Sequence, residues 1–356
     1  MKAGNRMWIC TAAVLVSVVC AVIVLSTRRS NEPISGGQPG FTHDEVETLM
    51  SLERIDEHPL YVMRYVGSYR TSDPSASASS EPNPSMPACG CTVFAALADP
   101  AQRLVGRNFD WPHNPTLLLF TNPPDAYASV TMVDLSFLFD AEAGGALDEM
   151  PITERRALLD TPFWTFDGMN ERGLAVGMAA VSTTTVAVDP DLPEVDSLRI
   201  MRDILDYAAT VEEAIALLTS VNIDFAGGPC MHYLIADRAG HSAVIEFWEN
   251  ETYVIRSERP WQFMTNYRLC RFAEEERAGV CWRYDGVSPV LSEAHGALSS
   301  QQALDLLDRV HYESPSTPEH ATQWSIVYEL ATGEILLAMD HDYETVHRFE
   351  LPREAD

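Results

Sequence analysis

A cysteine, an arginine and an aspartate are spaced so that one β-hairpin would bring them together. Cys91 opens a short apolar stretch, and Gly106–Trp111 follows it with Arg107 and Asp110. A returning hairpin would place both charged side chains beside the thiol. The arginine favours the thiolate, which is the nucleophilic form of cysteine. The pattern therefore indicates nucleophilic catalysis, although a lone cysteine on a strand is more commonly a small buried residue.

The carboxylate of Asp110 requires a cation of its own, because it would otherwise disfavour a neighbouring thiolate. The α-amino group of Cys91, with an ordinary pKa of about 7.7–8.0, would supply that cation if the chain were cut after Gly90. A freed amine can also act as general base for its own side chain. Thr71–Pro87 precedes the cysteine and is rich in Ser, Pro and acidic residues, a composition typical of an exposed, flexible linker. The sequence thus predicts cleavage between Gly90 and Cys91.

These stretches, taken with two further ones, resemble a known family in order and spacing. The further stretches are Asp167–Leu174 and Thr265–Tyr267. The chain is similar to the N-terminal-nucleophile hydrolases of the choloylglycine hydrolase and penicillin V acylase family, in the linear amide C–N hydrolase branch. The resemblance extends from Cys91 to about Leu351. It implies an α+β fold, the four-layer αββα sandwich of antiparallel sheets, and amide hydrolysis through an acyl-enzyme without metal or cofactor.

The resemblance also implies a role for each matched residue. Cys91 would be the nucleophile and, after cleavage, the base. Arg107 would lie against the sulfur, and Asp110 would hold the amine. Asn266 would donate its side-chain amide to the oxyanion, and the second donor would be a backbone N–H that the spacing assigns to Ala179. With a further family arginine, the candidate catalytic residues are Cys91, Arg107, Asp110, Ala179, Asn266 and Arg283.

Alternative interpretations of the same residues remain open. An acyltransferase would use the site with an amine in place of water, and a catalytically silent, membrane-tethered binding protein would keep the fold uncut. Cys89 is a rival nucleophile, but it is two residues out of register with Arg107. Asp340–Asp342 with His347 offers metal ligands, yet on an alternating strand such residues usually face solvent. We therefore expect no metal site.

The N-terminus carries a targeting signal. Lys2 and Arg6 precede an uncharged apolar run, Met7–Ser26, which is about the length needed to cross a bilayer as a helix. A retained anchor and a cleaved signal peptide are both open, and a lipoprotein signal at Cys20 is the weaker alternative. Either main interpretation places the rest of the chain outside the cytoplasm, anchored or secreted. Cleavage before Cys91 would free the enzyme from such an anchor.

The net charge and the cysteine pattern limit the molecules that this protein could bind. The 356 residues carry 24 Lys and Arg against 52 Asp and Glu, a net charge of −28, which excludes nucleic acid as a partner. Seven cysteines without a CxxC pair argue against a zinc ribbon. The expected partners are a small N-acyl amide and the membrane, and homo-oligomerisation remains open. We divide the chain into a signal or anchor (1–30), a prosegment (31–90) and a catalytic domain (91–356).

Short apolar runs separated by Gly or Asn turns predict antiparallel hairpins covered by helices. The expected strands are Leu60–Val66, Thr92–Leu97, Leu117–Thr121, Ser129–Val133, Leu174–Ala180, His232–Ala236, Ala243–Trp248, Trp324–Tyr328 and Glu334–Met339. The expected helices are Thr42–Arg54, one on the stripe from Leu198 to Ala208, one opened by Thr210 with Glu213, and one opened by Ser299 with Gln302.

Overall fold

The computed structural model describes residues 40–70, 90–139, 144–225, 230–314, 316–317 and 320–352. The apolar run Met7–Ser26 and the linker Thr71–Pro87, both singled out in the sequence, lie outside these residues. In the described part, none of the helices combines the length and the apolar composition that crossing a bilayer requires.

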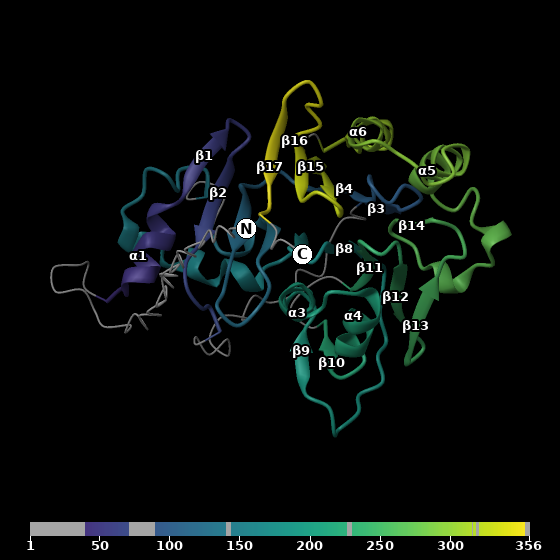
Figure 1. The fold of residues 1–356 in the computed structure, drawn as a ribbon, viewed down its shortest axis with the longest axis horizontal. Helices are drawn as coiled ribbons and strands as arrows, with labels where there is room; N and C mark the ends of the chain where they lie inside the picture. The colour runs from purple at the N-terminus through teal and green to yellow at the C-terminus, as the bar shows by residue number, and fades with distance from the viewer. Residues whose placement is uncertain are drawn as a thin grey trace, which may run out of the picture.

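Two large sheets form the centre of the molecule (Figure 1). The nine-stranded sheet runs in the order β1 (Glu53–Asp56), β2 (Leu60–Tyr65), β5 (Thr116–Thr121), β6 (Ser129–Asp134), β7 (Asp167–Asn170), β8 (Leu174–Ala180), β11 (Met231–Asp237), β12 (Ser242–Trp248) and β13 (Glu251–Arg256). The six-stranded sheet runs in the order β14 (Trp261–Met264), β3 (Cys91–Ala96), β4 (Leu104–Pro112), β15 (His320–Glu329), β16 (Glu334–Met339) and β17 (Val346–Glu350).

Helices cover the outer face of each sheet. On the nine-stranded sheet, α3 (Arg199–Tyr207) and α4 (Val211–Leu218) contact β7, β8 and β11. On the six-stranded sheet, α5 (Trp282–Glu293) and α6 (Ser300–Arg309) contact β3, β4, β14 and β15. Between the sheets β3 packs on β8 and β11, so the order is helices, sheet, sheet, helices (Figure 1). This confirms the expected α+β class with helix-covered sheets.

The remaining elements are short. Helix α1 (His43–Met50) packs beside β2, and a small parallel pair joins β9 (Glu194–Asp196) to β10 (Asn222–Asp224). The single-turn and longer 3₁₀ segments are η2 (Leu135–Phe137), η3 (Ile152–Glu154), η4 (Arg156–Phe163), η5 (Leu269–Arg271) and η6 (Glu274–Glu276).

Three local predictions need correction. The helix expected over Thr42–Arg54 ends at Met50, and Glu53–Asp56 forms a strand instead. Its beginning is as expected, because Thr42 caps the helix in a full capping box. The larger sheet is not purely antiparallel, since β2 pairs with β5 in parallel. Helix α5 was not predicted at all, because its apolar positions form no clear stripe.

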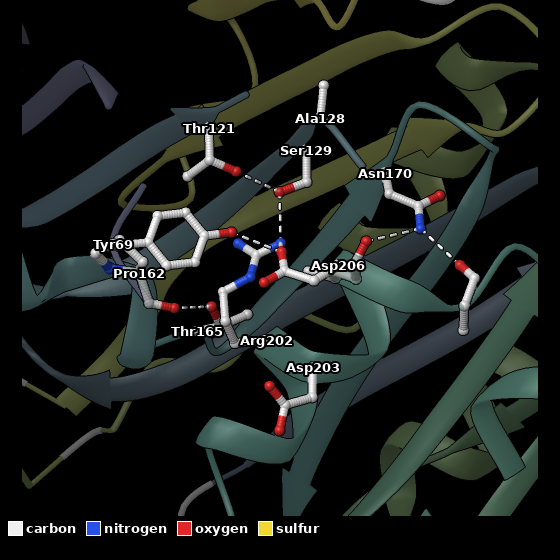
Figure 2. Close-up of polar contacts among 12 residues, drawn as sticks. Tyr69, Thr121, Ala128, Ser129, Pro162, Thr165, Asn170, Arg202, Asp203 and Asp206 are labelled. Carbon is white, nitrogen blue, oxygen red and sulfur yellow. Dashed lines mark hydrogen bonds and ion pairs between the residues drawn. The ribbon is translucent and has the colours of Figure 1, made fainter. Parts of the chain in front are cut away.

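Residues 40–70 belong to the same fold as the residues that follow Cys91. Strand β2 pairs with β5 from Leu60↔Thr116 to Tyr65↔Thr121. Just beyond it, the hydroxyl of Tyr69 donates to Asp206 on α3 at 2.6 Å (Figure 2). Arg202 donates to Ser129 at 2.7 Å in the same buried network (Figure 2). Cleavage before Cys91 would therefore leave this segment packed in the sheet, which is contrary to the release expected from the sequence.

Candidate active site

The predicted hairpin around Cys91 is present. Strands β3 and β4 pair in antiparallel fashion, with Cys91 opposite Phe109 and Val93 opposite Arg107. Residues opposite each other in such a pair share a face, so Arg107 and Cys91 both point into the space between the two sheets. The guanidinium Nη2 of Arg107 lies 3.9 Å from the Cys91 sulfur.

Arg107 takes its counter-ion from Asp167, the first residue of β7. Its Nη1 forms an ion pair with the Asp167 carboxylate, and its Nη2 donates to the carbonyl of Met178 at 3.1 Å. Trp324 and Tyr328 also donate to this carboxylate, from the indole N–H at 3.0 Å and from the phenol. The arginine and the aspartate are both buried. Asp167 thus fixes the cation beside the thiol, a positioning role that the sequence analysis did not recognise.

Asp110 lies on the opposite face of β4, because it is three residues from Arg107 and side chains alternate along a strand. Its Oδ2 is 3.2 Å from Nη1 of Arg283 on α5, and its Oδ1 accepts a 2.6 Å hydrogen bond from the Thr322 hydroxyl. The sequence argument that only a freed amine could neutralise this carboxylate is therefore wrong. Burial raises the pKa of Asp110 to about 6, and the bonds from Arg283 and Thr322 only partly oppose that rise.

Asn266 connects the nucleophile to this ion pair. Its Oδ1 accepts hydrogen bonds from the backbone N–H of Cys91 and, at 2.9 Å, from Nη2 of Arg283. Its Nδ2 donates to the carbonyl of Ala180 at 2.8 Å, which leaves the second N–H of the amide for another acceptor.

A buried histidine and glutamate hold the loop that carries this asparagine. His232 places Nε2 2.7 Å from the carbonyl of Thr265 and Nδ1 2.8 Å from Glu246. Glu246 in turn accepts from the backbone N–H groups of Leu269 and Cys270, each at 2.8 Å. These bonds lower the pKa of Glu246 against the effect of its burial. The loop is therefore fixed on both sides of Asn266.

Ala179 does not direct its peptide N–H into the site. Val181 donates to Cys230 at 2.8 Å across β8 and β11, and hydrogen-bonded pairs alternate in an antiparallel ladder. Ala179 is therefore the next residue bonded to β11. The peptide groups of its neighbour, Ala180, face the other way, toward Asn266. The spacing argument was wrong by one residue, which is enough to reverse the direction of every N–H.

The structure thus brings Cys91, Arg107, Asp110, Asn266 and Arg283 together, and the peptide that faces Asn266 is that of Ala180, not Ala179. The Cys91 side chain is 2 % exposed, and burial raises the pKa of its thiol although Arg107 opposes the rise. A thiol in this setting needs a base before it can attack a substrate. Among the described residues Cys230, Cys270 and Cys281 are free thiols as well, and Cys89 lies outside them.

Gly90 fits the site only because it lacks a side chain. A Cβ built at this position would lie 1.6 Å from Nη1 of Arg283 and 2.6 Å from Oδ2 of Asp110. The backbone immediately before Cys91 therefore packs against the buried ion pair.

The metal-binding alternative drawn from Asp340–Asp342 and His347 does not assemble as written. His347 is instead bonded to Asp56, with Nε2 2.6 Å from Oδ2. His341 faces Glu313, with Nδ1 3.4 Å from Oε1.

Comparisons with known proteins identify a family and a shared fold. Residues 91–268 match the family model described as linear amide C–N hydrolases, choloylglycine hydrolase family. Two structures of conjugated bile acid hydrolase from Clostridium perfringens, an arginine-to-leucine and a cysteine-to-alanine variant, share the fold with TM-scores of 0.53 and 0.52. Each is 14 % identical, over 73 % of this chain and 92 % of that one.

Penicillin V acylase from Agrobacterium tumefaciens is 18 % identical over 74 % of this chain and 92 % of that one, with a TM-score of 0.49. No curated protein matches the chain in sequence. The family model nevertheless covers half of the chain and begins its match at Cys91. The chain belongs to the choloylglycine hydrolase family and is a hydrolase of linear amide C–N bonds.

Proposed function

We propose that this enzyme hydrolyses N-acyl amides through a thioester on Cys91, after cleavage of the Gly90–Cys91 bond has made that residue an N-terminus. The supporting observation is that three groups converge on one residue. The sulfur of Cys91 lies 3.9 Å from Arg107, its backbone nitrogen bonds Asn266, and the preceding Gly90 packs on the Arg283–Asp110 pair. Burial raises the pKa of the Cys91 thiol, so the thiol requires a base, and the freed amine of the same residue would supply one.

Maturation uses the same atoms as catalysis. The thiol of Cys91 attacks the carbonyl carbon of Gly90, the peptide C–N bond breaks, and the thiol proton passes to the released nitrogen. Water then hydrolyses the resulting thioester, which frees the sulfur and leaves a carboxylate on Gly90. The close packing of Gly90 against Asp110 and Arg283 supports this step, because it holds the scissile peptide in one position.

In the mature enzyme the amine of Cys91 takes the thiol proton, and the sulfur attacks the substrate carbonyl. The amine then protonates the leaving nitrogen, the C–N bond breaks, and water hydrolyses the thioester. The free N–H of Asn266 and the backbone N–H of Ala180 are the proposed donors to the oxyanion, because both belong to groups on the same side of β8. Each such donor contributes about 2.7–4 kcal/mol by analogy with measured oxyanion holes.

The acyl part of the substrate is proposed to be apolar. Phe109 lies directly opposite Cys91, and the half-buried Trp111 stacks on it at 5.8 Å between ring centroids. The two conjugated bile acid hydrolases share this fold, so bile-acid conjugates are one substrate class to test. Penicillin V and acyl-homoserine lactones fit the same acyl-amide description.

We further propose that the enzyme works outside the cytoplasm, anchored to the membrane or secreted. The proposal rests on the apolar run Met7–Ser26, flanked by Lys2 and Arg6 on its N-terminal side. Fractionation tests it. Intact chain in the membrane fraction or outside the cell is expected, and intact chain soluble in the cytoplasm would contradict it.

Activity measurements on the full-length enzyme test the proposed chemistry. We expect hydrolysis of at least one member of a panel of glycine-conjugated bile acids, penicillin V and acyl-homoserine lactones, unchanged by EDTA and abolished in Cys91→Ala. Cys230→Ala, which removes a thiol outside the site, serves as the matched control and should retain activity. A competing amine added to the assay identifies acyl transfer if it captures the acyl group in place of water. Full activity of Cys91→Ala would overturn the thioester mechanism.

A further inference from the structure

Three side chains that can ligate a metal meet on the surface near the end of α6. His311 follows that helix, Glu313 forms an isolated bridge with Ala321, and His341 lies in the turn between β16 and β17. One ligand atom from each of the three lies within 4.8 Å of the others. The two imidazole rings stack at 5.2 Å between centroids, with an interplanar angle of 10°.

Each imidazole presents one nitrogen to the glutamate and the other to a second oxygen. Nε2 of His311 is 4.0 Å and Nδ1 of His341 is 3.4 Å from Oε1 of Glu313. On the far side of the rings, Nδ1 of His311 bonds the backbone carbonyl of Asp308, and Nε2 of His341 is 3.8 Å from Asp340. Histidines that bind metals characteristically donate their other N–H to a carbonyl or carboxylate, as His311 does here, whereas the separation at His341 is an ion-pair distance and not a hydrogen bond.

The backbone is bent to place one of these ligands. Asp340 and His341 have φ values of 48° and 49°, so two successive residues with side chains occupy the left-handed region. Such conformations are costly and concentrate at functional sites.

We propose that His311, Glu313 and His341 bind one Zn²⁺ ion, with water completing the coordination. Two histidines and a carboxylate are an established zinc ligand set. Zn–N distances of about 2.0–2.1 Å place tetrahedral ligand atoms about 3.4 Å apart, and the separations of 3.4 and 4.0 Å from Glu313 already approach that. Glu313 is exposed, so it can turn to close the remaining gap.

The site is separate from the catalytic groups but adjacent to one of them. Tyr312, between two of the ligands, donates its N–H to the hydroxyl of Thr322 at 2.8 Å. That hydroxyl donates in turn to Asp110 at 2.6 Å. A bound ion would therefore lie beside the loop that contacts Thr322, while the proposed amide hydrolysis involves no metal and the expected indifference of activity to EDTA is unchanged.

Zinc titration of the full-length Cys91→Ala chain tests the proposal, because this chain lacks the catalytic thiol, and the histidine variants separate the proposed site from the remaining cysteines. Calorimetry should show one zinc ion bound tightly per chain. Co²⁺ bound in its place should give the intense visible absorption of a four-coordinate site. His311→Ala and His341→Ala should each bind at least about tenfold more weakly. His43→Ala, which removes an exposed histidine on α1, should bind as the parent does.

Thermal unfolding in EDTA shows whether the substitutions damage the fold. The parent and the three histidine variants should unfold at similar temperatures without metal, so a difference in zinc affinity then reports on the site. Equal zinc affinity in the parent, His311→Ala and His341→Ala would overturn the proposal. So would the absence of a stoichiometric equivalent in the parent.

Discussion

The guanidinium of Arg283 lies 3.2 Å from the carboxylate of Asp110, on the face of β4 turned away from Arg107. The same guanidinium donates to Oδ1 of Asn266 at 2.9 Å. One arginine from α5 therefore joins a strand carboxylate to the loop amide that contacts the nucleophile. Arg107 and Arg283 form separate ion pairs on the two sides of the Cys91 strand, with Asp167 and Asp110 respectively.

On the acidic side of the pH–activity profile, the change in activity should follow the deprotonation of Asp110. Its pKa is raised to about 6 by burial, so below that pH the carboxyl is neutral and loses its ion pair with Arg283. Activity should rise with pH through about 6. The effect on stability has the opposite sign. The pKa of Asp110 in the folded protein exceeds the unfolded value of 3.8. Its stabilising contribution to the free energy of unfolding is therefore complete below pH 3.8 and is lost as the pH rises through about 6.

Thr322→Val provides the check on that assignment. The Thr322 hydroxyl lowers the pKa of Asp110, so removing it should move the acid limb of kcat/KM to higher pH. Thr332→Val, at an exposed turn near β16, should leave the limb in place. An unmoved limb in Thr322→Val would show that another group controls it.

Asp167→Asn should destabilise the protein severely. It leaves Arg107 buried without a counter-ion, a change that typically costs about 3–5 kcal/mol in the free energy of unfolding. Asp342→Asn, at an exposed turn, is the matched control and should cost little. The double variant Arg107→Met with Asp167→Leu should recover part of the lost stability in denaturant titration, because it removes the unpaired charge but leaves the Trp324 and Tyr328 donors without their acceptor, and it should not recover activity. Recovery of both would mean that Arg107 has no role at the thiol.

Asn266→Ala should lower kcat by about 10²–10³ with a smaller change in KM, because oxyanion donors act mainly in the transition state. Asn266→Asp keeps an oxygen toward Cys91 and Arg283 but removes the N–H donors, so it should lose kcat to a similar degree. Steady-state kinetics on processed enzyme measure both variants. A loss confined to KM would contradict the assigned role.

After cleavage, the segment containing residues 40–70 should stay bound to the part that begins at Cys91. It supplies β1 and β2 to the larger sheet, and Arg70 contacts Asp203 and Asp206 on α3. A tag on the N-terminal fragment should therefore retain the whole enzyme under native conditions and only its own fragment in denaturant. Arg70→Ala should weaken retention, whereas His43→Ala should not. Separation of the fragments in native buffer would refute this prediction.

The sequence was informative where the interactions are local. Cys91 and Arg107 lie on adjacent strands of one hairpin, so a short motif with its spacing was enough to bring them together. The same motif also contained a detail that was overlooked. Asp110 is the third residue after Arg107, and side chains three positions apart on a strand lie on opposite faces. The hairpin therefore could not have placed both charged side chains on the face of the strand that carries the thiol.

The rest depends on contacts between distant segments. The pairing of β2 with β5, the placement of Arg283 by α5 and the bond from Thr322 to Asp110 each join residues far apart in sequence, and no local pattern specifies them. The assignment of Ala179 failed for a different reason. Spacing located the correct strand, but only the hydrogen-bond register shows which peptide groups face the site.

Gly90 offers a direct perturbation of the proposed maturation. In Gly90→Ala the added methyl would displace the buried Arg283 from Asp110, so cleavage should slow strongly while the unprocessed chain still folds. Pro260→Ala, at a turn outside the site, should mature normally. Gel analysis of the two chains over time measures the difference, and equal rates would show that the Gly90 contact does not matter.

The mass of the polypeptides in active enzyme tests the central claim most directly. We predict two chains, one beginning with the free amine of Cys91 and one ending at Gly90, and a single uncleaved chain in Cys91→Ala. An active enzyme in which the Gly90–Cys91 peptide bond is intact would contradict the account, because Cys91 would then have no amine to serve as its base.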